Sequence, residues 1–148
     1  MRRRIPLLAL TAAVSLALTI SVSAVSAESQ RAFAGRISMT GAAEVPGPGD
    51  SDASGTAIIV IVPALDRVCW MLSWDGIDGT VSAAHIHGPA TTSQSAGVLV
   101  PLSVSSTGSS SGCAVDADAD AIAANPSMYY VNVHSDVFPA GAIRGLLD

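Results

Sequence analysis

The 148-residue chain contains no lysine, and its seven basic residues are all arginines. Three of them occupy positions 2–4, so the chain after residue 27 sets four arginines against twelve carboxylates, a formal charge of −8. A surface with this charge repels nucleic acid and anionic lipid, and we exclude both as partners. The apolar run at residues 56–62 is too short to cross a bilayer, so no transmembrane segment is expected after residue 27.

Catalytic motifs are also scarce. Serine is abundant, but no serine occupies a G-x-S-x-G motif, so nothing supports a hydrolase triad. Asp116, Asp118 and Asp120 alternate, but their spacing lacks the glycine and distal glutamate of a calcium-binding loop. We therefore expect no catalysis.

The amino terminus has the three parts of an export signal. Arg2, Arg3 and Arg4 give a positive start, an uncharged apolar stretch follows to about residue 22, and small residues precede Glu28. This order predicts a signal peptide at residues 1–27, cut after Ala27, with a cut after Ala24 as the alternative. The mature chain, residues 28–148, has the length of one domain. It would be secreted or periplasmic.

The chain has two cysteines, Cys69 and Cys113. In an exported protein, an even number of cysteines predicts a disulfide between them, which would stabilise the fold by about 3–4 kcal/mol. The alternative is a pair of free, buried thiols.

Short apolar or alternating segments separated by Gly, Pro, Ser and Asp clusters indicate an all-β fold. Residues 56–62 are apolar at both alternating positions, which predicts a central strand covered on both faces. Residues 103–111 predict a mobile hairpin tip, and residues 116–125 the one short helix. The strands are expected at residues 33–39, 56–62, 68–74, 81–87, 98–102, 112–115, 129–134 and 142–147. Seven or eight strands with one short helix predict a Greek-key β-sandwich or barrel.

All three histidines lie in two of these strands. Side chains alternate along a strand, so His85 and His87 project from one face while Ile86 points to the other. The same rule sets His134 opposite Val131 and Val133. If the two strand ends are neighbours, three imidazoles converge outside the core, the minimum for a copper or zinc site with an open position.

Two other interpretations of the histidines stay open. They could serve as hydrogen-bonding posts for loops, or form a pH-sensitive structural cluster without metal. Asp136, two residues beyond His134, is the best candidate for a fourth ligand or for a group that orients the ligands. Arg144 is expected to pair with Asp136 or Asp148 at the surface.

Three ordered motifs resemble the CHRD domain, the module first described in chordin and found in many bacterial exported proteins. The resemblance covers about residues 31–148. The motifs are AHIHGPA at residues 84–90, YVNVH at residues 130–134 and PAGAIRGL at residues 139–146.

The resemblance implies a β-sandwich of immunoglobulin-like or superoxide-dismutase-like character and implies little about activity. The H-x-H strand is similar to the copper strand of copper/zinc superoxide dismutase, but the chain lacks the further histidines and the aspartate of that two-metal site. We therefore expect an exported binding or structural module of the cell envelope or extracellular space, acting on an unidentified protein or envelope ligand. The alternative is a copper- or zinc-binding protein with redox activity.

Overall fold

The computed structural model describes residues 31–148 except residue 106. The predicted signal peptide, its cleavage site and the start of the domain at residue 28 lie outside the described residues. No helix in the described part has the length and apolar character needed to span a membrane.

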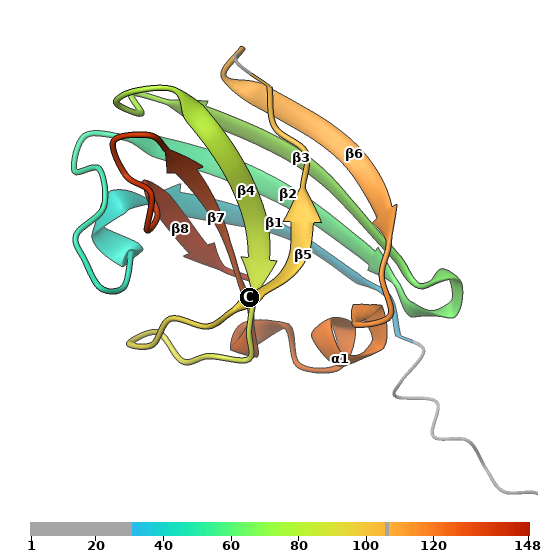
Figure 1. Ribbon diagram of the computed structural model, residues 1–148. Helices are drawn as coiled ribbons and strands as arrows, with labels where there is room; N and C mark the ends of the chain where they lie inside the picture. Colours follow the sequence, from blue (N-terminus) through green and yellow to red (C-terminus); the bar gives the residue numbers. More distant parts are fainter. Residues whose placement is uncertain (1–30, 106) are drawn as a thin grey trace, which may run out of the picture.

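Eight strands form one antiparallel sheet that curves into a nearly closed barrel (Figure 1). Their order in the sheet is β5-β4-β7-β8-β1-β2-β3-β6. The strands are β1 (Phe33–Thr40), β2 (Ser54–Val62), β3 (Arg67–Asp75), β4 (Val81–His87), β5 (Val98–Leu102), β6 (Ser109–Val115), β7 (Tyr130–Ser135) and β8 (Ile143–Leu146). The predicted all-β class is confirmed.

The helical segments are short. Helix α1 (Ala119–Ala124) is the only α-helix in the described residues and lies within the predicted range. Three single 3-10 turns are η2 (Gly41–Ala43), η3 (Pro63–Leu65) and η4 (Pro126–Met128). In Figure 1, α1 lies at the end of the barrel toward which β4 runs, and its Ala119 and Ile122 are fully buried in the core.

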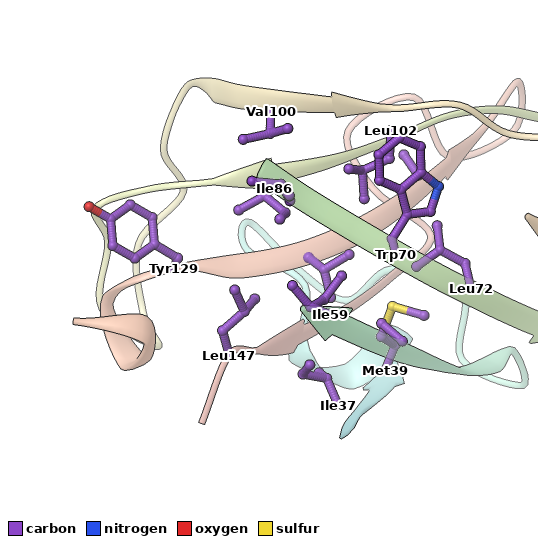
Figure 2. Close-up of a cluster of buried hydrophobic side chains, with 14 of the residues drawn as sticks. Ile37, Met39, Ile59, Trp70, Leu72, Ile86, Val100, Leu102, Tyr129 and Leu147 are labelled. Atoms are coloured by element: carbon purple, nitrogen blue, oxygen red, sulfur yellow. The ribbon is translucent and has the colours of Figure 1, made fainter. Parts of the chain in front are cut away.

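The core fills the inside of the curved sheet with alternate residues of the strands. Figure 2 shows side chains from opposite parts of the barrel converging, among them Ile37, Ile59 and Ile86. Trp70 is buried in this cluster as its alternation with Val68 and Leu72 predicts. The same alternation leaves every second residue of each strand for the outer face.

Two details differ from the sequence prediction. Strand β2 is central, but Ile58, Val60 and Val62 on its outer face are only half-buried, so the predicted full cover on both faces is wrong. The serine-rich segment is also more ordered than expected, since Ser109–Val115 pairs with β3 as a regular strand. Ser110 Oγ donates to the carbonyl of Ser103, which links this strand to the segment after β5.

A disulfide joins Cys69 of β3 to Cys113 of β6, as predicted. The two residues are direct partners across the ladder, and their Cα atoms lie 4.0 Å apart. The bond fastens the edge strand β6 to the sheet, and a disulfide is typical of a protein that works in an oxidising compartment.

Candidate metal centre

The three histidines meet on the outer face of β4 and β7. These strands pair antiparallel, with His85 opposite Asn132 and Ala83 opposite His134. Ile86, between the first two histidines, is fully buried on the core side. The prediction that the three imidazoles share one face outside the core is confirmed.

The imidazoles form a tight cluster. The ring centroid of His85 lies 4.9 Å from that of His134 and 5.3 Å from that of His87, and the third separation is 6.0 Å. One nitrogen from each ring belongs to a group in which all nitrogens lie within 4.8 Å of one another. His87 and His134 are 6 % and 9 % exposed, while His85 is the most open of the three.

Backbone carbonyls set the orientation of two of the rings. His87 Nδ1 lies 2.9 Å from the carbonyl oxygen of Ala96, and His134 Nδ1 lies 3.1 Å from that of Pro139. A carbonyl only accepts hydrogen bonds, so each Nδ1 carries the proton and donates it. Each Nε2 is then left with its lone pair, which is the form that binds a metal.

The lone pair of His87 Nε2 has no hydrogen-bond partner, although the atom is buried. An orphaned polar atom of this kind costs free energy and calls for an explanation. The lone pair of His134 Nε2 instead accepts a bond from His85 Nδ1, at 3.1 Å. Three nitrogens at about 2.0–2.1 Å from one ion lie about 3.3–3.6 Å apart, so nitrogens that now lie within 4.8 Å of one another would have to move closer to share an ion.

His85 and His134 hold their protons weakly. Burial, followed by the neighbouring His134 and His87, lowers the pKa of His85 to about 4. Burial also lowers the pKa of His134, against a smaller opposing effect of its bond to Pro139. At neutral pH both rings are uncharged, so a metal would displace no proton from an imidazolium ion.

A loop at residues 88–97 covers the cluster. Gly88 allows the chain to leave β4 sharply, with φ of 150°, and a Cβ there would clash with a ring carbon of Tyr129. The loop returns at Ala96, whose carbonyl binds His87 and whose amide donates to Tyr130 Oη at 3.1 Å. Residues 88–97, which connect β4 to β5, therefore form one wall of the site.

Arg144 fastens this loop to the sheet. The guanidinium donates to the carbonyls of Gln94 and Thr91, at 3.0 and 3.2 Å, and its carbon lies 3.5 Å from the centroid of the Tyr130 ring. That ring in turn stacks on His87, with centroids 4.8 Å apart and planes within 2°. The predicted surface ion pair of Arg144 with Asp136 or Asp148 is wrong. Arg144 is 2 % exposed, and its charge is satisfied by carbonyls and a ring face.

Sequence reasoning missed Glu44 as part of this region. Glu44 is 5 % exposed as a residue, its carboxyl lies against the backbone of Gly141, and its Oε1 has no hydrogen-bond partner. Burial raises the pKa of Glu44 to about 7, against opposing effects of Arg144, the Val45 amide and Asn132. A cavity of about 190 Å³ lies between the segment that follows β1 and the loop at residues 88–97. Its lining includes Glu44, Thr92 and Arg144.

Asp136 lies apart from the imidazoles. Its Oδ1 accepts a hydrogen bond from the Thr80 amide at 2.7 Å, and its own amide donates to the Thr80 carbonyl. It is not a member of the group of converging nitrogens. In this conformation Asp136 ties the turn after β7 to the start of β4.

The sequence that forms this barrel and its polar outer face matches a known protein family. The family model of the CHRD domain matches residues 36–147, which include every strand except the start of β1. The chain belongs to the CHRD domain family. No curated protein and no solved structure matches it significantly.

We predict that Gly88→Ala destabilises the domain by about 2–4 kcal/mol, because the new methyl group meets Tyr129 and the backbone is left-handed. Gly97→Ala is the matched control at the other end of the loop, where nothing lies within 4 Å of the position that a methyl group would take. Urea unfolding checks both variants. Equal stabilities would contradict the tight fit described for Gly88.

We predict that charging Glu44 costs stability. The folded-state pKa of about 7 lies above the ordinary 4.5, so the folded protein holds this proton more tightly than the unfolded chain. The contribution of Glu44 to the free energy of unfolding is therefore lost as pH rises from about 4.5 to 7. It stays lost at higher pH. The shift corresponds to about 3 kcal/mol for a fully shielded group, and we expect about 1–2 kcal/mol because solvent near the surface screens the carboxyl.

The lowered pKa values of His85 and His134 act with the opposite sign, because they make stability rise with pH below about 6.5. The comparison that isolates Glu44 is therefore the wild type against Glu44→Gln, by urea unfolding between pH 4 and 8. The variant should gain on the wild type as pH rises and keep the gain above pH 7. A difference that does not vary with pH would disprove the assignment.

Proposed function

We propose that this CHRD domain is an exported binding module whose ligand is a transition-metal ion, held by His85, His87 and His134. The observation that carries the proposal is the buried, unpartnered Nε2 of His87. Its ring offers one nitrogen to a group in which the nitrogens of all three histidines lie within 4.8 Å of one another. A purely structural histidine would normally have both ring nitrogens satisfied. A metal ion supplies the missing partner.

The surroundings of the rings support the same proposal. Ligand histidines usually donate their second nitrogen to a carbonyl or carboxylate, which fixes the ring and its tautomer. His87 and His134 both do so, through Ala96 and Pro139. Imidazole donors suit copper and zinc, so these are the two metals to test first.

Binding, rather than catalysis, is the role we assign to the centre. The wall formed by residues 88–97 and the burial of two of the three rings leave His85 as the side open to solvent. Such a site suits the capture and holding of an ion outside the cytoplasm.

The test is titration of the untagged, purified protein with Zn(II) and Cu(II), followed by metal analysis after gel filtration. We predict one bound ion per chain. At a free-metal concentration of 100 times the dissociation constant, binding stabilises a domain by about 2.7 kcal/mol, which raises the melting temperature by about 10 °C. His87→Gln and His134→Gln should remove both the stoichiometric ion and the thermal shift.

Asp136→Asn is the matched control, because it keeps an oxygen acceptor for Thr80 and lies beside the same strand end. It should bind as the wild type does. Loss of the ion in this variant would bring Asp136 back as a ligand, and a wild type that retains no ion would end the metal proposal.

Export is proposed from the sequence at residues 1–27 and is supported by the disulfide, since Cys69 and Cys113 are oxidised. Expression of the full chain in a bacterial host should release a protein whose amino terminus is Glu28. Intact-mass measurement on the culture medium or periplasmic extract checks this. Recovery of only the uncleaved chain in the cytoplasm would refute it.

A further inference from the structure

We propose that the centre selects copper in its monovalent state, and that the buried Arg144 sets this preference. The inference rests on the proposed metal function and deepens it. Imidazole is a ligand for both copper and zinc, so the donor atoms alone do not decide between them. The charge around the donors does.

The ligand group itself carries no negative charge. The three histidines are the members of the converging group, and no carboxylate or thiolate of the described residues belongs to it. A complex with a monovalent ion would carry one positive charge, and a complex with Zn(II) or Cu(II) would carry two. In a partly buried place, each additional uncompensated charge is costly.

The groups behind the rings do not offset that charge. The hydrogen-bond acceptors of His87 and His134 are the neutral carbonyls of Ala96 and Pro139. A carboxylate in the same place would make the imidazole more basic and help it to hold a divalent ion. Neutral carbonyls orient the rings without this help.

A buried positive charge lies behind one of the ligand rings. The guanidinium of Arg144 stacks on Tyr130, which stacks on His87, with separations of 3.5 and 4.8 Å. The charge therefore lies within about 8 Å of the centre of the ligand ring. An ion bound to that ring would lie farther away, within about 12 Å of the charge. At an effective dielectric constant of about 20, a unit charge at about 12 Å changes the binding of each further unit of metal charge about tenfold. Arg144 penalises a divalent ion more than a monovalent one.

Among the described residues no further protein donor belongs to the group, so a fourth ligand would have to be a solvent molecule on the side of His85. Zn(II) in proteins takes four ligands and Cu(II) takes a tetragonal set, so each would need at least one more donor. His87 and His134 are nearly closed to solvent, and the loop at residues 88–97 covers them. A monovalent copper ion is satisfied by three nitrogen donors.

Glu44 is a buried carboxyl whose charge opposes that of Arg144. Its interaction with the guanidinium is favourable, and its other neighbours are Asn132, the Val45 amide and Gly141. The two residues therefore provide variants with opposite expected effects. Neither of them is a proposed ligand.

The experiment compares the dissociation constants of Cu(I) and Zn(II) for the untagged wild type at pH 8. Cu(I) is measured without oxygen, in the presence of ascorbate, by competition with a chromogenic chelator, and Zn(II) with a zinc-responsive dye. We expect Cu(I) to bind at least about 100-fold more tightly than Zn(II), because charge and coordination number act together. Arg144→Gln should reduce this ratio about tenfold, Arg144→Lys should leave it within about threefold, and Glu44→Gln should increase it.

The outcomes separate the two proposals. Zn(II) binding as tight as Cu(I) overturns the selectivity and leaves the metal site standing, whereas failure of both ions to bind overturns the proposed function as well. A ratio unchanged in Arg144→Gln overturns the role of Arg144. If that variant does not fold, the wild-type ratio and the increase in Glu44→Gln decide the question.

Discussion

The attachment of one loop to the outer face of the sheet is the constraint on which the candidate centre depends. Residues 88–97 contribute no side chain to the imidazole cluster, but their carbonyls accept hydrogen bonds from His87 and Arg144. These bonds bury a polar face that would otherwise be open to water, and they fix the ring of His87. Without the loop, His87 would lose the carbonyl that orients its ring, whereas His134 would keep its bond to Pro139.

The molecule therefore has two buried regions of different character on the two sides of β4 and β7. On the inner side, aliphatic groups such as Ile86 and Val131 fill the barrel. On the outer side, charged and polar groups are buried, and each needs a partner. The stack of Arg144, Tyr130 and His87 meets most of that need with carbonyl acceptors and ring faces.

The sequence was sufficient to predict those parts that follow from local alternation. Alternation of side chains along strands places His85, His87 and His134 opposite Ile86 and Val133, and this needs no knowledge of the tertiary structure. The composition of the turns likewise gave strand boundaries close to those of the barrel. The disulfide followed from there being two cysteines in a chain with a predicted export signal.

Other parts depend on how distant loops are laid on the sheet, which alternation does not encode. Arg144 has the pattern of an exposed strand residue, and it is buried by the path of residues 88–97 together with the Tyr130 ring. Glu44 belongs to a turn-rich segment with no periodic signal, yet the fold places it against Gly141. Asp136 is close to His134 in sequence, but the turn after β7 directs it to Thr80.

The separation of the imidazole cluster from the apolar core has a consequence for how the protein would acquire an ion. Twenty buried hydrophobic residues form one continuous cluster inside the barrel, and the disulfide fastens its edge strand, so folding does not wait for a ligand. Small zinc domains, by contrast, are unfolded until the metal arrives. Here an empty chain would already be complete when it meets an ion, and it could release that ion and take up another while its barrel stays intact.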